Sequence, residues 1–172
     1  MPAITPREAE ALRDALELAQ QSRAFCERVI RDHGLVRPFS RIREAERLRI
    51  QALRRLLYVY GLAFSAIQRE AAGPATASLT EACTWAAEQE AGRQRRIAQL
   101  LGSTTNEHLQ VALSSMLSAS ELRYLPAYAR CGQCRNTAAG GCPDGPNRSP
   151  DAPPRRCVAR AHQDWLWIEG PE

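Results

Sequence analysis

Two pairs of residues have a spacing that could do chemistry. Glu46 is followed three residues later by Arg49 and Glu121 by Tyr124, and a further glutamate, Glu90, lies between the pairs in the sequence. Residues i and i+3 share one face of a helix, so each pair directs two polar groups to one point. Di-iron and di-manganese carboxylate bundles use this spacing, with Glu-x-x-His on two helices and one Glu on each of the others. The three glutamates are therefore candidate metal ligands.

Arginine and tyrosine stand where such a bundle has histidines. Carboxylates in an apolar interior repel one another and lose hydration, so they need positive charge nearby. We expect Arg49 to supply it through charge-assisted bonds to Glu46 and to either Glu90 or Glu121, with Tyr124 donating a hydrogen bond to a carboxylate. Two alternatives stay open: one ion held by the three glutamates, and a helix rotation that leaves these residues in solvent.

A second set of candidate ligands lies near the C-terminus. Cys131 and Cys134 form a Cys-x-x-Cys pair, and Cys142 and Cys157 follow. Four thiolates suit tetrahedral zinc, although structural zinc sites usually combine two close pairs, and fourteen residues separate Cys142 from Cys157. Zinc in this segment is therefore one reading, and reduced thiols without metal or a redox pair at Cys131 and Cys134 are the others.

The composition is typical of a soluble globular chain. Of its 172 residues, 44% are hydrophobic and 24% are charged, and no apolar stretch approaches the roughly 20 residues that span a bilayer. The N-terminal segment lacks the basic and apolar regions of a signal peptide. We therefore expect a cytoplasmic location, no membrane association, and cysteines that are thiols or metal ligands rather than disulfides.

The basic residues are 23 arginines with no lysine, and the net charge is +4. Arginines occur along the whole chain and are mixed with glutamates, whereas a nucleic-acid-binding protein usually concentrates them on one element. We interpret Arg43, Arg47, Arg54 and Arg55 as a solvated helix face and expect no nucleic-acid partner. A basic patch that binds nucleic acid is the alternative.

Four amphipathic helical patterns must position these residues. Thr5 and Glu8 form a capping box at the start of the first, which ends at Gly34. The second runs from near Ser40 to Gly61. The sequence thus predicts a first helical hairpin with a short link.

The third and fourth patterns form a second hairpin. The third begins at Ser78 and ends at Gly102, and the fourth begins at Thr104, with Glu107 in the reciprocal capping position. Pro126 predicts a kink, or an end of the helix soon afterwards. On the inward seams, Cys26 and Cys83 are expected to act as small hydrophobic residues.

The lengths of the connections indicate the topology. Short, long and short connections are typical of two hairpins joined by a crossover, as in ferritin-like bundles. From Cys131 onward the sequence is rich in Gly, Pro, Asn and Asp. We predict an all-α four-helix bundle over residues 1–130 and a cysteine-containing, loop-rich tail over residues 131–172, partly disordered or stabilised by zinc.

Four stretches carry a resemblance to a known family. They are RAFCERVI, GLVRPFSRIREAERLRIQALRRLLYVYG, EACTWAAEQE and LRYLPAYARC, one from each predicted helix, and the resemblance covers roughly residues 8–131. In these stretches the chain resembles the ferritin-like superfamily, and within it a group of small rubrerythrin-like, di-iron-type bundles of bacteria and archaea. The resemblance implies a four-helix bundle with a centre of six metal ligands.

The resemblance also implies which ligands remain. In chain order, the six ligand positions of the family fall at Ala19, Glu46, Arg49, Glu90, Glu121 and Tyr124. Three carboxylates are kept and both histidines are absent. Dioxygen chemistry and ferroxidation need two metals about 3.5–4 Å apart. We therefore expect a decayed di-iron site in a protein that is not an enzyme, has no cofactor in its core, and acts by binding a protein partner or by self-association.

Two other functions stay open. An oxidoreductase or iron-handling protein would use iron or manganese at Glu46, Glu90 and Glu121. A regulatory or nucleic-acid-binding protein would use zinc in the tail.

Overall fold

The computed structural model describes residues 4–63 and 73–133, and every regular element in these ranges is helical. In chain order the elements are α1 (Pro6–His33), α2 (Phe39–Val59), α3 (Leu79–Gly102), α4 (Glu107–Ala119), the π-helical turn η2 (Ser120–Tyr124) and α5 (Leu125–Gln133). The prediction of an all-α bundle is confirmed. None of these helices combines the length and apolar character needed to cross a bilayer.

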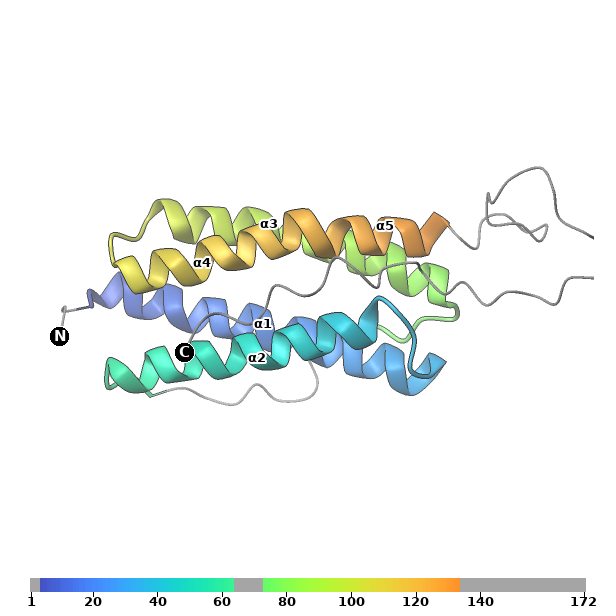
Figure 1. The fold of residues 1–172 in the computed structure, drawn as a ribbon, viewed down its shortest axis with the longest axis horizontal. Helices are drawn as coiled ribbons and strands as arrows, with labels where there is room; N and C mark the ends of the chain where they lie inside the picture. Colours follow the sequence, from blue (N-terminus) through green and yellow to red (C-terminus); the bar gives the residue numbers. More distant parts are fainter. Residues whose placement is uncertain (1–3, 64–72, 134–172) are drawn as a thin grey trace, which may run out of the picture. The chain divides into compact units, whose positions relative to one another are not determined.

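The chain divides into two compact units, Met1–Asn136 and Thr137–Glu172, and all the described helices belong to the first. In that unit α1 packs along α2, and α3 packs along α4, η2 and α5. Figure 1 shows these segments side by side. Residues 34–38 and 103–106 form the short links within the two hairpins, whereas residues 60–78 separate α2 from α3.

Local sequence sets the starts of α1 and α3. The Thr5 hydroxyl accepts a hydrogen bond from the Glu8 N–H at 3.2 Å, and the Glu8 carboxylate accepts one from the Thr5 N–H at 3.0 Å, which confirms the predicted capping box. At α3, the Ser78 hydroxyl accepts from the Glu81 N–H at 3.1 Å. The Glu81 carboxylate accepts from the Ala77 N–H at 2.8 Å, so the reciprocal bond falls one residue earlier than in a capping box.

The fourth helix begins later than predicted. Its N-cap is Asn106, whose side chain accepts from the Leu109 N–H at 3.2 Å. Thr104 does not serve as the cap because its hydroxyl donates to Glu8 at 3.2 Å instead. The local pattern predicted Thr104 as the N-cap of the fourth helix. In the structure it instead bonds to the start of α1.

Glu8 connects the start of α1 to the link between α3 and α4. Its carboxylate accepts from the Thr105 N–H at 2.9 Å and the Asn106 N–H at 2.8 Å, in addition to the bonds from Thr5 and Thr104. The residue is only 4% exposed. These bonds, with that from the Thr5 N–H the largest, hold the pKa of Glu8 far below its usual range.

A π-helical turn lies directly before Pro126. The Leu125 N–H donates to the Ser120 carbonyl five residues back. Proline has no N–H, and its ring crowds the carbonyl four residues earlier, that of Leu122. The wider turn relieves this crowding, and the helix continues through α5 to Gln133. The irregularity predicted at Pro126 therefore appears in the turn that precedes it.

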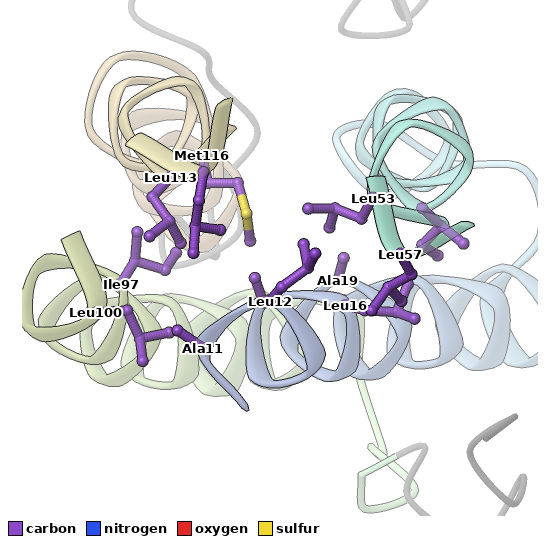
Figure 2. Packing of buried hydrophobic residues seen from close by; sticks show 13 residues of the cluster. Ala11, Leu12, Leu16, Ala19, Leu53, Leu57, Ile97, Leu100, Leu113 and Met116 are labelled. Carbon is purple, nitrogen blue, oxygen red and sulfur yellow. The ribbon is translucent and has the colours of Figure 1, made fainter. Parts of the chain in front are cut away.

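The interior holds two apolar clusters. The first is formed by the N-terminal half of α1, the C-terminal halves of α2 and α3, and α4. Figure 2 shows its side chains converging from these helices, among them Leu12, Leu53, Ile97 and Met116. The second cluster occupies the other half of the bundle and contains Phe25, Cys26, Val29, Phe39, Ile42, Leu79, Ala82, Cys83, Ala86, Tyr124 and Tyr128.

A disulfide joins Cys83 of α3 to Cys131 of α5. Packing of α5 on α3 brings these residues, 48 apart in sequence, to a Cα–Cα separation of 6.0 Å, within the range that a disulfide requires. The expectation of thiols rather than disulfides is wrong for this pair. Disulfides are rare in cytosolic proteins, so the bond also weakens the ground for a cytoplasmic location. Cys26 is buried and free among the described residues.

Candidate functional site

The candidate site is a polar layer between the two apolar clusters, near the middle of the helices. It consists of two ion pairs, Glu46 with Arg49 on α2 and Glu90 with Arg93 on α3, together with Tyr124 of η2. Both glutamates are buried, with exposed fractions of 0% and 1%. The arginine side chains are 15% and 12% exposed. We call these five residues the ion-pair layer.

The α2 pair has the contact that the sequence predicted. Arg49 Nη1 donates to Glu46 Oε1 at 2.6 Å and to the Tyr124 hydroxyl oxygen at 3.2 Å. The guanidinium carbon also lies 5.6 Å from the centre of the Tyr124 ring, within the range of a cation–π interaction. The predicted pairing of Arg49 with Glu46 is therefore confirmed.

The surroundings of this pair shift the proton affinities of its members. Burial and, next, the negative charge of Glu46 raise the pKa of Tyr124 to about 12. Burial lowers the pKa of Arg49, but the Glu46 carboxylate and Tyr124 together outweigh this effect, so the net pKa is raised. At neutral pH Arg49 therefore carries its positive charge and Tyr124 is a neutral phenol.

Arg93 links three helices. Its Nη2 forms a close ion pair with the Glu90 carboxylate, its Nη1 lies 3.9 Å from Glu46 Oε1, and the same Nη1 donates to the Leu18 carbonyl of α1 at 3.2 Å. Arg93 was not among the candidate residues predicted from the sequence. The signal that identifies it is the repeat itself, because Glu90-x-x-Arg93 has the spacing of Glu46-x-x-Arg49.

Two expectations about the partners of Arg49 are corrected. Glu90 has its own arginine and does not depend on Arg49. Glu121 is exposed, so the prediction that it faces the interior is wrong. The cause is η2: a π-helical turn contains more residues per turn than an α-helix, so Ser120 and Tyr124 both face the interior and Glu121 turns to the surface.

Two buried polar atoms, one in the ion-pair layer and one on η2, lack hydrogen bonds in the described part of the chain. Glu46 Oε2 and Ser120 Oγ are buried and make no hydrogen bond to the described residues. Buried polar atoms are usually paired, since each unpaired one costs about 1–3 kcal/mol. The pairing of opposite charges, rather than complete hydrogen bonding, therefore holds the layer together.

The donor set does not fit the di-metal centre that the resemblance implies. A carboxylate-bridged pair of ions needs ligands from all four helices, whereas the layer offers two carboxylates, each already bound by a guanidinium. The first ligand position of the family holds Ala19, which is fully buried in the first apolar cluster. Over residues 4–63 and 73–133, no three His, Cys, Asp or Glu side chains gather closely enough to hold an ion.

The cysteine set is divided between described and undescribed parts of the chain. Cys131 is bonded to Cys83 and is not a thiolate, so a four-thiolate zinc site that includes it is incompatible with the disulfide. Cys134, Cys142 and Cys157 lie outside the described residues. Cys26 lies 3.8 Å from the Tyr128 hydroxyl, and burial raises the pKa of its thiol to about 12, which makes it unreactive as a nucleophile.

Comparison with known proteins shows a likeness of fold. No family model matches the sequence, and no curated protein matches it. Among solved structures, the hypothetical protein MJ0754 from Methanococcus jannaschii DSM 2661 has a similar structure, with a TM-score of 0.70 and 16% sequence identity over 79% of this chain and 85% of that one. At this identity the likeness concerns the arrangement of the helices alone.

Proposed function

We propose that this protein is a ferritin-like bundle in which an internal ion-pair layer has replaced the di-metal centre. It is not an enzyme, and it acts by binding a protein partner or by self-association. The observation that carries the proposal is the 2.6 Å contact between Arg49 Nη1 and Glu46 Oε1. There the guanidinium stands at the position where the family has a histidine, and it neutralises the carboxylate that would otherwise hold a cation.

The charge balance of the layer supports this reading. Two carboxylates face two guanidiniums, so the formal charge of Glu46, Arg49, Glu90 and Arg93 together is zero. A divalent ion would add positive charge beside two buried arginines, and charges interact strongly in a protein interior. Arg93 lies near Glu46 as well as Glu90. It therefore disfavours a bound cation in addition to the absence of the histidine ligands.

Metal content tests the proposal directly. Protein expressed in medium supplemented with iron and manganese, and purified without chelators, is expected to contain well below one equivalent of either metal. A value near one or more per chain, lost on substituting Glu46→Gln, would overturn the proposal and favour an iron-handling or oxidoreductase function.

A gain-of-binding variant tests the assignment of positions. Arg93 must be removed along with the altered ligands, so the variant combines Ala19→Glu, Arg49→His, Arg93→Ala and Tyr124→His. It is expected to bind about one or more iron ions per chain. The control is Arg95→His, which adds an imidazole on the exposed side of α3. A folded variant that binds no more iron than this control would show that the ligand positions are misassigned.

A further inference from the structure

The positive charge of the bundle is concentrated on one helix. Outside the buried Glu46–Arg49 pair, α2 carries five arginines and one glutamate. In contrast, α1 carries five arginines and six acidic residues, and α3 carries three of each. The even spread of arginine that the sequence suggested therefore does not hold for the surface: the excess lies on α2.

Four residues of α2 form a line along its solvent side, and we call Arg43, Arg47, Arg54 and Tyr58 the arginine stripe. Steps of four, seven and four residues keep side chains on one flank of an α-helix, and fifteen residues extend about 22 Å. Tyr58, at the end of the line, is 86% exposed. The stripe thus contains three arginines, of which Arg47 is paired with Glu44, and one exposed tyrosine.

A groove adjoins the other end of the stripe. It has a volume of about 180 Å³ between α1 and α2 and is lined by Arg23, Glu27, Arg43, Glu44 and Arg47. Arg23 pairs with Glu27 at 2.8 Å. The α1 side of the groove therefore adds no net charge, and the excess of arginine along the groove comes from α2.

Glu44, which lies beside the arginine stripe, does not cancel the positive charge of the stripe. Glu44 Oε1 accepts hydrogen bonds from Nε and Nη2 of Arg47, at 2.8 and 2.7 Å. Those bonds, and after them the charges of Arg47, Arg43 and Arg23, lower the pKa of Glu44. Outside the buried Glu46–Arg49 pair, α2 carries five arginines against one glutamate, so its surface has a net positive potential, which attracts polyanions.

We propose that the arginine stripe binds the phosphate backbone of single-stranded nucleic acid and that Tyr58 stacks on a base. Guanidinium groups bind phosphate in a bidentate, charge-assisted manner. Proteins that bind single strands combine a positive track for the backbone with aromatic side chains for the bases. The inference goes beyond the proposed function, which gives the bundle a protein partner or self-association, because it adds a nucleic-acid ligand at a separate surface.

An anionic membrane is a poorer fit to this helix. Peripheral helices bind membranes by inserting an apolar face into the lipid. The apolar face of α2 is already buried in the bundle, where Ile42, Ile50, Leu53 and Leu57 belong to the two clusters. The solvent side of α2 is mainly charged, and its most exposed apolar side chain is Tyr58 at 86%, followed by Leu48 at 43% and Val59 at 42%.

Binding of the full-length protein to a fluorescein-labelled single-stranded 20-mer, measured by anisotropy at 50 and 200 mM salt, tests the proposal. The triple variant Arg43→Gln, Arg47→Gln, Arg54→Gln is expected to weaken binding at least about tenfold. It should also reduce the slope of log affinity against log salt by about 2, since each phosphate contact on a single strand contributes about 0.7. The matched control is Arg7→Gln, Arg31→Gln, Arg95→Gln, which removes the same charge from exposed positions elsewhere.

Tyr58 separates stacking from charge. Tyr58→Ala is expected to weaken binding about fivefold or more, and Tyr58→Phe to leave it nearly unchanged, because stacking needs the ring and not the hydroxyl. No detectable binding at 50 mM salt, or equal losses in the two triple variants, would overturn the proposal. So would equally tight, stripe-dependent binding of poly-glutamate or of phosphatidylserine vesicles. None of these results bears on metal content, so this inference and the proposed function fail separately.

Discussion

Arg93 of α3 places its Nη1 atom 3.9 Å from Glu46 Oε1 of α2, so the two hairpins meet through opposite charges in the interior. The contact lies between the two apolar clusters, and Arg93 also reaches Glu90 and the Leu18 carbonyl. Charge pairing is directional where apolar packing is not. The layer therefore favours one register of the hairpins over alternatives that would leave a carboxylate unpaired.

Removing Arg49 tests how far Glu46 depends on it. Arg49→Leu leaves a fully buried carboxylate whose nearest remaining cation is 3.9 Å away. Breaking a buried ion pair from one side costs about 3–5 kcal/mol, and we expect a loss of that size in urea unfolding. The control, Arg55→Leu on the exposed side of α2, should change stability by no more than about 0.5 kcal/mol. A change in Arg49→Leu as small as the control's would mean that Glu46 needs no partner there.

Replacing both partners should have a much smaller effect. In Glu46→Leu, Arg49→Leu no buried charge is left unpaired on α2, and such replacements are often neutral or stabilising by about 1–4 kcal/mol. The same urea titration measures it. If the double variant is as unstable as Arg49→Leu alone, the role of Arg49 is packing rather than charge compensation.

Tyr124 should make the protein sensitive to alkali. Its pKa is raised to about 12 in the folded state, by burial and by Glu46, against about 10 in an unfolded chain. The unfolded state therefore loses its proton first, and this contribution to stability, complete below about pH 10, is lost as the pH rises towards 12. Tyr124→Phe should flatten the pH dependence of thermal unfolding over this interval. It should also remove one phenol step near pH 12 from the absorbance titration; an unchanged titration would place Tyr124 elsewhere than in the layer.

Glu8 should make the protein sensitive to acid. Its folded-state pKa lies far below the unfolded value of about 4.3. The stabilisation is therefore complete above that value and is lost as the pH falls below it. Glu8→Gln is expected to cost at least about 2 kcal/mol at pH 7, because several buried donors lose a charged acceptor.

The pH dependence of the Glu8 variant provides its own control. The gap in stability between the wild type and Glu8→Gln should narrow steadily from pH 5 to pH 2. A stability gap that stays constant over this range would mean that these hydrogen bonds do not lower the pKa of Glu8. Glu10→Gln, on the exposed side of the same helix, should show no such gap.

The Cys83–Cys131 disulfide should stabilise the bundle under oxidising conditions. It closes a loop of 48 residues, which corresponds to about 4 kcal/mol from restriction of the unfolded chain. Cys83→Ser should lower the free energy of unfolding by about this amount without reductant. Dithiothreitol should lower the wild type to a similar level and leave the Cys83→Ser, Cys131→Ser variant unaffected. Equal stability of the wild type with and without reductant would show that the bond does not form.

The ion-pair layer could be predicted in part. Glu46, Arg49 and Glu90 were placed on inward seams by helical periodicity, and all three lie there. The prediction for Glu121 was wrong because it assumed one regular α-helix, whereas η2 has more residues per turn. The role of Arg93 was missed because its contacts with Glu46 and Leu18 join helices far apart in the sequence.

From its local patterns alone, the sequence predicts the four helical segments, the Thr5–Glu8 capping box and the buried faces of α1, α2 and α3, because these depend on interactions within a few residues. Tertiary packing determines which charges meet between helices, that Thr104 bonds to Glu8 rather than capping its own helix, and that Cys83 reaches Cys131. These contacts are set by the relative positions of whole helices, where burial makes an unpaired charge or donor costly.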